Sequence, residues 1–225
     1  MKLTTIILTK NEETNIERSI KSCLFADEVI IIDDFSNDKT TEIAKKNLAK
    51  IIQRKLNSNF SDQRNYAFEI AKGDWIFFLD ADEEITPELK QEIELFIKNN
   101  SKYSVAYIKR RDFWWGRELR YGEVRKVYKQ GLIRLIKKNS GRWEGLVHEK
   151  FIYTGFSNRF KNYINHFPHP TIKDFINDIN FYSTLRSEEL NKIGRKTNIF
   201  DVSFTPLFKF IHNYLVKLGF LDGVQ

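Results

Sequence analysis

Two carboxylates that stand one residue apart, Asp80 and Asp82, follow a run of apolar residues and have the spacing of a metal site. The run at 75–79 has the length of a strand, and its continuous apolar character is typical of a strand covered on both faces. In such sheets, ligands bind beyond the carboxyl ends of the strands. Carboxylate oxygens suit Mg²⁺ or Mn²⁺, ions that usually also contact substrate phosphates. The alternative interpretation is an acidic turn ahead of a helix that begins at Pro87.

Polar side chains also follow the first two predicted strands. Thr9, Asn11 and Glu12 come at or after the end of the first strand, and Asp33 ends the second. Hydroxyl and amide groups there can contact the base and ribose of a nucleotide, and a carboxylate can accept a hydrogen bond from a base N–H. The alternative for the second loop is a turn or a helix N-cap, with Ser36 as one capping residue. We expect Asp33 to be the functional residue.

The pattern of the first hundred residues alternates between strand and helix. Strands are predicted at residues 3–9, 28–33, 50–54 and 74–79, and helices at 14–23, 39–46, 62–71 and 87–99. This alternation predicts an α/β fold in which helices flank both faces of a mostly parallel sheet. Short alternating segments between residues 101 and 153 predict a mixed or antiparallel extension of that sheet.

The last part of the chain is predicted to be helical. One helix is expected at 172–193, a polar linker at 194–198, and a second helix with an apolar stripe and basic residues at 206–220. A basic amphipathic helix can lie in a membrane interface, and packing on the domain or on a partner is the alternative. The expected parts of the chain are a nucleotide-binding half at 1–100, an acceptor-side half of the same domain at 101–193, and a helical tail at 194–225.

Charge is distributed unevenly along the chain. The net charge is +7, but residues 1–100 carry 14 basic and 19 acidic side chains, whereas residues 101–225 carry 23 basic and 11 acidic ones. A basic second half suits an anionic acceptor, a phospholipid surface or a nucleic acid. The single cysteine, Cys23, excludes an internal disulfide and fits a cytoplasmic protein. No apolar stretch reaches the ~20 residues that a membrane span needs.

Several short motifs occur in a fixed order. They are TKNE at 9–12, DDFSNDKT at 33–40, QRN at 63–65, LDAD at 79–82 and WEGLVHE at 143–149. Together they resemble the family 2 glycosyltransferases, which have a GT-A fold. The nearest resemblance is to the small bacterial branch of lipopolysaccharide-core glucosyltransferases of the WaaE/KdtX type. A dinucleotide-binding Gly-x-Gly-x-x-Gly motif and a P-loop are both absent from the sequence.

This resemblance implies a donor site for a nucleotide-diphosphate sugar, with UDP favoured. The residues assigned to the donor are Thr9, Asn11, Glu12, Asp33, Gln63, Arg64, Asp80 and Ala81. In the family the first carboxylate of the metal motif often contacts ribose, and the last one holds the metal. Asp82 is therefore expected to hold Mn²⁺ or Mg²⁺, with Asp80 as a second candidate ligand. Arg64 is expected to contact the nucleotide or diphosphate, or alternatively to form a salt bridge to the acidic site.

An inverting transfer also needs a base that takes the proton of the acceptor hydroxyl. Many relatives use a Glu-Asp pair in the second half of the domain, and this chain has none downstream of the metal motif. We expect Glu149 to be the base, with Glu144 as the second candidate. His148 is expected to be a third metal ligand or a diphosphate contact. A purely structural role is the alternative.

Two further groups of residues are candidates for the acceptor side or for a metal. Trp114, Trp115 and Arg117 combine aromatic faces that can stack on sugar rings with a cation that can hold phosphate or carboxylate; a core tryptophan pair is the alternative. His166 and His169 have a spacing that can chelate a metal. The prolines around them favour an ordered loop instead.

The sequence therefore predicts an inverting, metal-dependent hexosyltransferase. The expected donor is a UDP-hexose, and the expected acceptor is an anionic or lipid-linked glycan of the cell envelope, such as lipopolysaccharide core. The expected location is the cytoplasm, with peripheral contact to the inner face of the cytoplasmic membrane. A nucleotidyltransferase acting on a sugar phosphate is the alternative, although a glycine-rich basic loop is missing after the first strand. A nucleic-acid-binding module is a weaker alternative, and no nucleic acid is expected because the first half is acidic.

Overall fold

The computed structural model describes residues 1–99, 102–146 and 149–223. The elements of the first half are β1 (Leu3–Thr9), α1 (Ile16–Cys23), β2 (Glu28–Asp33), α2 (Thr40–Lys46), β3 (Lys50–Gln53), α3 (Phe60–Ile70), β4 (Trp75–Asp80), β5 (Glu83–Ile85) and α4 (Pro87–Asn99). The predicted alternation of strand and helix is therefore confirmed, with most bounds shifted by two residues or fewer.

The second half adds strands and then helices. Its elements are β6 (Tyr103–Trp114), β7 (Arg117–Leu119), η1 (Gly122–Val124), α5 (Arg125–Gln130), β8 (Leu132–Lys137), β9 (Gly141–Glu144), β10 (Lys150–Tyr153), β11 (Phe156–His166), α6 (Ile172–Lys192), α7 (Ile199–Ile211), the π-turn η2 (His212–Val216) and η3 (Gly219–Asp222).

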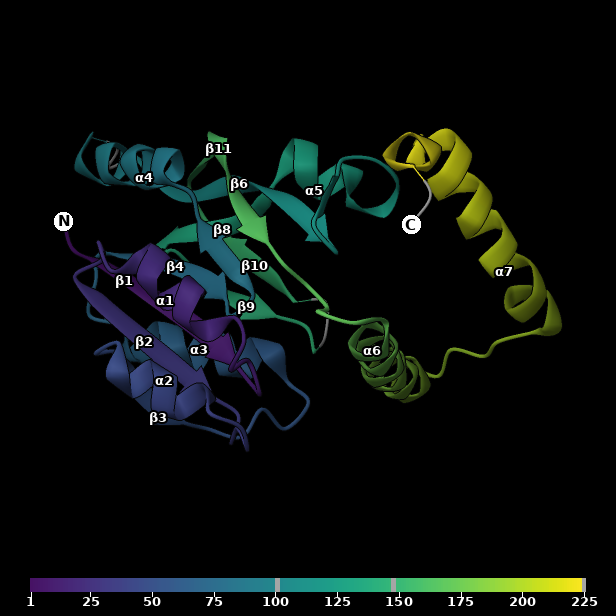
Figure 1. Ribbon diagram of the computed structural model, residues 1–225, viewed down its shortest axis with the longest axis horizontal. Coiled ribbons are helices and arrows are strands. Elements are labelled where there is room, and N and C mark those ends of the chain that lie inside the picture. The colour runs from purple at the N-terminus through teal and green to yellow at the C-terminus, as the bar shows by residue number, and fades with distance from the viewer. Residues whose placement is uncertain (100–101, 147–148, 224–225) are drawn as a thin grey trace.

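One sheet joins both halves of the chain (Figure 1). Its strand order is β3-β2-β1-β4-β8-β6-β11-β5, with β7 paired to β6. Strands β1 to β4 are parallel to one another, and β8 runs antiparallel to both β4 and β6. The predicted fold class, a mostly parallel sheet with a mixed extension, is thus confirmed. The chain moves outward from β1 to β3 and then returns to the other side of β1 with β4, so the carboxyl ends of β1 and β4 flank a switch point where ligands bind in such folds.

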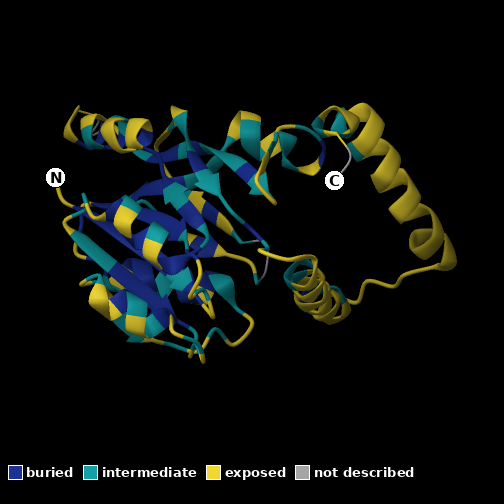
Figure 2. Ribbon diagram, viewed as in Figure 1, coloured by how far each residue is buried: buried dark blue, intermediate teal, exposed yellow. Residues whose placement is uncertain are grey.

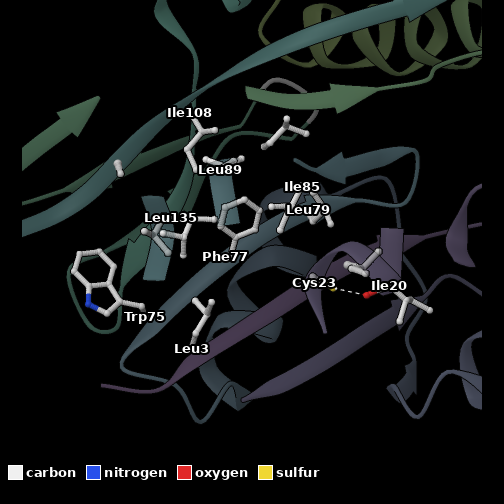
Figure 3. Packing of buried hydrophobic residues seen from close by; sticks show 14 of the residues in the cluster. Leu3, Ile20, Cys23, Trp75, Phe77, Leu79, Ile85, Leu89, Ile108 and Leu135 are labelled. Atoms are coloured by element: carbon white, nitrogen blue, oxygen red, sulfur yellow. Dashed lines mark hydrogen bonds between the residues drawn. The ribbon is translucent and has the colours of Figure 1, made fainter. Parts of the chain in front are cut away.

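Strand β4 is apolar without interruption because both of its faces are covered. Trp75, Phe77 and Leu79 pack into one core cluster with α1 and α4 (Figure 3). Ile76 and Phe78 pack into a second cluster that includes residues of α3, β9 and β10. Burial on both faces fixes the register of β4, and with it the direction in which Asp80 leaves the sheet.

The tail differs from its prediction. The expected helix at 206–220 is wrong at both ends, because α7 begins at Ile199 and ends at Ile211. The early start is explained by a capping box, in which Asn198 and Asp201 each bond to the other's backbone N–H. Leu218, with φ of +62°, interrupts the helical conformation after the π-turn.

Helix α7 extends away from the sheet and is exposed along its whole length (Figure 2). A connecting segment joins it to α6, and its far end returns toward α5 (Figure 1). Among the described residues, no helix has both the length and the apolar composition required to cross a bilayer.

Candidate active site

The carboxyl ends of β1, β2 and β4 bring the predicted loops together. The strand registers pair Thr9 with Asp33 and Leu8 with Asp80, so these side chains start from neighbouring positions at one edge of the sheet. Strands β6 and β11 bring further residues to the same edge. They lie far away in the sequence, and the sequence patterns did not assign most of them.

Asp82 and His166 form the most informative contact at this edge. The Nε2 atom of His166 lies 3.0 Å from Oδ2 of Asp82, and its Nδ1 atom lies 2.5 Å from Oδ1 of Asp112. Sheet register explains the meeting, because His166 pairs with Asp112 across β11 and β6 and with Glu83 across β11 and β5. The backbone N–H of Phe167 also donates to the carbonyl of Asp82 at 2.9 Å.

The charges of this trio depend on one another. Burial alone lowers the pKa of His166, but the charge of Asp82 and the hydrogen bonds to both carboxylates raise it to about 9. Burial works against ionised Asp82, yet the charge and hydrogen bond of His166 hold the pKa of that carboxyl below its usual value. Without a competing cation, the imidazole is therefore protonated near neutral pH and bridges two carboxylates.

Asp80 is held by arginines. Its Oδ2 atom accepts from Nη2 of Arg134 at 2.5 Å, and the same nitrogen lies 2.5 Å from Oε1 of the fully buried Glu83. Arg110 also approaches Glu83 at 3.5 Å. Burial raises the pKa of Glu83, whereas Arg134 and Arg64 hold the pKa of Asp80 well below its usual range although burial opposes them. The sequence did not assign Arg134 or Glu83 to the site.

Arg64 links Asp80 to the predicted base. Its Nε atom lies 2.7 Å from Oε1 of Glu149, and its Nη2 atom lies 3.4 Å from Oδ1 of Asp80. The guanidinium also lies over the rings of Phe78 and Trp143. Its remaining nitrogen, Nη1, is buried and has no hydrogen-bond partner among the described residues. Arg64 thus forms the salt bridge expected as one alternative and keeps a donor available for an anion.

The loop after β1 is held by hydrogen bonds of Asn11 and Glu12, whereas the hydroxyl of Thr9 has no partner among the described residues. The Thr9 hydroxyl is buried and makes no hydrogen bond within the described part of the chain. Asn11 has φ of +54°, and its Oδ1 accepts from the backbone N–H of Asn37 at 2.8 Å. Glu12 accepts from the side chain of Asn15 at 3.0 Å. Burial, and next the charge of Asp82, raise the pKa of Glu12 to about 7.

Asp33 and Gln63 have internal partners. The carboxylate of Asp33 is fully buried and accepts from the backbone N–H and the hydroxyl of Ser36 and from Nε2 of Gln53. The bonds from Ser36 to Asp33 are those of the turn that was the alternative interpretation of this loop. Gln63 exchanges hydrogen bonds with Arg54 at 2.5 and 2.9 Å and ties α3 to the segment after β3.

Other predicted site residues lie at the cluster, outside it or beyond the described residues. Ala81 is buried between the two motif carboxylates. Glu144 is exposed and pairs with Arg142 at 2.6 Å, so it is not brought to the cluster. His148 lies outside the described residues. Helix α6 contacts α3 through the stacked rings of Tyr182 and Phe60, whose centroids are 6.3 Å apart. Partial burial, and next the charges of Asp80, Asp178, Asp82 and Glu149, raise the pKa of Tyr182 to about 12.

The acceptor-side candidates form an aromatic group next to the loop after β11. The ring of Trp114 lies 5.4 Å from that of His169 and 5.8 Å from that of Trp115, and Trp115 is exposed with φ of +45°. Arg117 is exposed on β7, paired with Trp114. Nδ1 of His169 lies 3.0 Å from Oδ2 of Asp178, whereas His166 contacts Asp82 and Asp112. The two histidines therefore have different partners and do not form one metal site.

The oxygen of Asp82 and the nitrogen of His166 are of the kinds that divalent cations bind. Within the described residues, no group of three or more His, Cys, Asp or Glu side chains is arranged to hold a metal ion. Asp82 and His166 offer an oxygen and a nitrogen 3.0 Å apart, and Asp112 fixes the histidine ring as in many metal sites. Mg²⁺ and Mn²⁺ commonly take their other ligands from phosphates and water.

Comparisons with known proteins agree on one family. The profile described as "Glycosyl transferase family 2" matches residues 4–175. The uncharacterized glycosyltransferase RT0209 of Rickettsia typhi is 30% identical over 237 residues, covering 99% of this chain and 79% of the relative. The lipopolysaccharide core biosynthesis glycosyltransferase LpsC of Rhizobium meliloti is 24% identical, covering 99% of this chain and 82% of LpsC.

Among solved structures, the fold is similar to that of residues 1–349 of TarS from S. aureus. The TM-score is 0.54 at 21% identity, with 82% of this chain and 65% of the TarS chain covered. This chain thus spans less than two thirds of that solved chain. At this identity the likeness shows a shared GT-A fold.

Proposed function

The chain belongs to glycosyl transferase family 2, and on that premise we propose that it transfers a hexose from UDP to a cell-envelope glycan with inversion. The observation that carries the proposal is the contact of Asp82 with His166 at the switch point of the sheet, beside the loops that end β1 and β2. That edge combines a candidate metal pair, an available arginine nitrogen and a carboxylate in the base position.

Asp82 and His166 are the proposed ligands of Mn²⁺ or Mg²⁺. When bound, such an ion neutralises the leaving diphosphate as a Lewis acid. Asp112 keeps Nδ1 of His166 engaged, so that Nε2 is the nitrogen presented to the site. Arg134 compensates the charges of Asp80 and Glu83 and holds the loop between them in place. Nη1 of Arg64 is proposed to donate a hydrogen bond to a phosphate of the nucleotide sugar.

Glu149 is the proposed base. Arg64 orients its carboxylate, whose side chain is 12% exposed, at the same edge as Asp80. As the acceptor hydroxyl oxygen attacks C1 of the sugar, its proton passes to Glu149, and the C1–O bond to the diphosphate breaks. The products are the inverted glycoside and UDP. Glu144, which pairs with Arg142 on the surface, is the weaker candidate.

UDP is proposed as the nucleotide because TarS, which shares the fold, has been crystallised with UDP-GlcNAc. Thr9, Asn11 and Asp33 are the proposed contacts to base and ribose, and the unpaired hydroxyl of Thr9 supports this assignment. Asp33 would have to exchange its bonds to Ser36 for a base N–H, or share them.

A lipopolysaccharide-core or lipid-linked glycan is the proposed acceptor. The name of LpsC and the basic second half of the chain support this choice. Trp114, Trp115 and Arg117 are the proposed acceptor contacts, and the proposed place of reaction is the inner face of the cytoplasmic membrane. No observation favours the two other predicted functions, a nucleotidyltransferase or a nucleic-acid-binding module.

Thermal stabilisation tests the donor assignment. UDP, GDP, dTDP and CMP are each added with and without Mn²⁺, and a shift with UDP that requires Mn²⁺ is expected. A ligand at a hundred times its Kd stabilises the folded state by about 2.7 kcal/mol, which is easily measured. Asp82→Asn should lose the Mn²⁺-dependent part of the shift. A folded protein that responds to none of these nucleotides would contradict the proposal.

A further inference from the structure

We infer that residues 199–222, called here the arm, bind the surface of an anionic phospholipid bilayer. The inference deepens the proposed function and rests on it in one respect, since a lipid-linked acceptor would be reached at that surface. It names the segment that makes the contact and the lipid chemistry that it recognises.

The arm exposes an unusual amount of apolar surface. Phe200 and Phe208 on α7 are 67% and 65% exposed. The large exposed hydrophobic residues of the arm are Ile199, Phe200, Val202, Phe204, Leu207, Phe208, Phe210, Ile211, Tyr214, Leu215, Val216, Phe220 and Leu221. Soluble monomers rarely leave a contiguous apolar surface of this kind facing water. The arm therefore needs something that covers it.

A bilayer surface matches the dimensions of the arm. Helix α7 has 13 residues, or ~20 Å at 1.5 Å per residue, whereas the hydrocarbon core of a bilayer is about 30 Å thick. The helix is thus too short to cross and has the composition to lie in the interface. Phe200, Phe204 and Phe208 follow at helical spacing with ring centroids 5.6 and 6.5 Å apart, forming one aromatic ridge along α7.

The far end of the arm is fixed to the domain. The carboxylate of Asp222 accepts from the backbone N–H of Arg120 at 3.1 and 3.2 Å and from that of Tyr121 at 2.9 Å. The N–H of Gly122 donates to the carbonyl of Lys217 at 3.2 Å, and Asn213 donates to Glu123 at 2.5 Å. These bonds, called here the clasp, hold the arm out from the sheet although its apolar side chains remain uncovered (Figures 1 and 2).

The basic residues around the arm favour an anionic bilayer as its partner. Basic residues lie before, along and beside the arm: Lys192, Arg195, Lys196, Lys209, Lys217, Arg117, Arg120, Arg125 and Lys126. The acids Asp201, Glu123 and Asp222 are engaged in the helix cap or the clasp. The arm itself contains two lysines and two aspartates, so the positive charge comes from its neighbours, among them Arg195, Lys196 and Lys126. An anionic lipid surface attracts such residues at about 1 kcal/mol per basic residue.

The clasp also connects the arm to the candidate acceptor residues. Arg120 and Tyr121 directly follow β7, whose Arg117 pairs with Trp114 of β6. Trp114 in turn contacts His169, three residues after the proposed metal ligand His166. A bilayer against the arm would therefore lie on the side of the molecule from which a lipid-linked acceptor reaches Trp114 and Trp115.

Vesicle flotation of the full chain tests the inference. The vesicles contain phosphatidylcholine alone or phosphatidylcholine with phosphatidylglycerol. We expect flotation only with phosphatidylglycerol, weakened by high salt. Phe204→Glu with Phe208→Glu should lower the bound fraction at least about tenfold, since two buried aromatic side chains contribute that much. Leu48→Glu with Leu95→Glu, which changes two exposed hydrophobic residues elsewhere, is the matched control and should float like the wild type.

The possible outcomes separate the inference from the proposed function. Flotation that is unchanged in the Phe204→Glu, Phe208→Glu protein would overturn the inference. So would a wild-type chain that ignores both vesicle types, or one that forms a dimer in light scattering which the two substitutions dissolve. UDP-dependent stabilisation is measured on the same proteins without vesicles. Its loss in all of them would reject the donor assignment and leave the lipid result standing.

Discussion

The Nδ1 atom of His166 lies 2.5 Å from a carboxylate oxygen of Asp112, across the pairing of β11 with β6. The contact fixes the plane of the imidazole and leaves Nε2 directed at Asp82. Carboxylates that orient metal-binding histidines in this way are part of many metal sites. A residue that touches neither sugar nor phosphate is thus expected to control how the site holds its cation.

Asp112→Asn should weaken Mn²⁺ binding about 10- to 100-fold, because the amide keeps the shape but loses the charge that orients His166. Titration of Mn²⁺ against the UDP-dependent thermal shift measures this. Asp62→Asn is the matched control, since Asp62 also pairs with a cation, Arg54, but away from the site. Equal Mn²⁺ affinity in both variants would mean that Asp112 has only a structural role.

Asp82→Ala should abolish sugar transfer, with a loss of at least about 10²-fold, because the leaving diphosphate would lose its electrostatic partner. The readout is release of UDP in the presence of acceptor. Glu84→Gln, which changes the next but one acid in the same segment, is expected to keep most of the activity. Substantial transfer by Asp82→Ala would exclude Asp82 as a required ligand.

Arg134→Ala should lower the free energy of unfolding by about 3–5 kcal/mol, because it leaves buried Glu83 and partly buried Asp80 without their shared cation. Urea denaturation measures the effect. Arg142→Ala removes an ion pair whose arginine side chain is 76% exposed, and is expected to change stability by about 1 kcal/mol or less. Similar decreases in the free energy of unfolding in the two variants would show that the buried ion pairs of Arg134 stabilise the fold no more than an exposed pair does.

Glu149→Gln should stop turnover while donor binding persists, because glutamine can still accept from Arg64 but cannot take a proton. Single-turnover transfer and UDP-dependent stabilisation separate the two effects. Glu144→Gln is the matched control on the neighbouring strand. Turnover that survives in Glu149→Gln would assign the base elsewhere.

Glu12 should make stability depend on pH in a defined direction. Burial, and next the charge of Asp82, raise its folded-state pKa from 4.5 to about 7. The folded chain therefore binds more protons than the unfolded chain between these values, and this contribution to stability falls as pH rises from about 4.5 to 7. Glu12→Gln should remove the fall, which amounts to at most about 3 kcal/mol. Tm measured against pH for both proteins should converge below about pH 4.5, separate as pH rises to about 7 and keep a constant difference above it. A constant difference across the whole range would contradict the assignment.

The sequence predicted the first half of the site better than the second. The position of Asp80 and Asp82 at the edge of the sheet could be predicted, because an apolar strand buried on both faces leads directly to them. His166 was considered only as part of a pair with His169, and Asp112 and Arg134 were not considered. These residues depend on the registers of β11 against β6 and β5, and local periodicity carries no information about pairing between strands so far apart.

The tail shows the same division between local and long-range information. The apolar stripe predicts a helix there that starts at Pro206. The stronger signal is the capping box of Asn198 and Asp201, which starts the helix at Ile199. The clasp of Asp222 on the backbone after β7 joins positions 102 and 101 residues apart, and no local pattern predicts it.

The distance along the chain between the two proposed metal ligands has a consequence for folding. Asp82 and His166 are 84 positions apart, and β11 must insert between β6 and β5 before they meet. Contacts between distant segments form slowly, because the loop between them must close first. The contact between Asp82 and His166 therefore cannot exist during synthesis until β11 has been made. A nascent chain that ends before β11 would lack the proposed metal pair, and it would also lack Phe160 and Ile164 of the core cluster around β4.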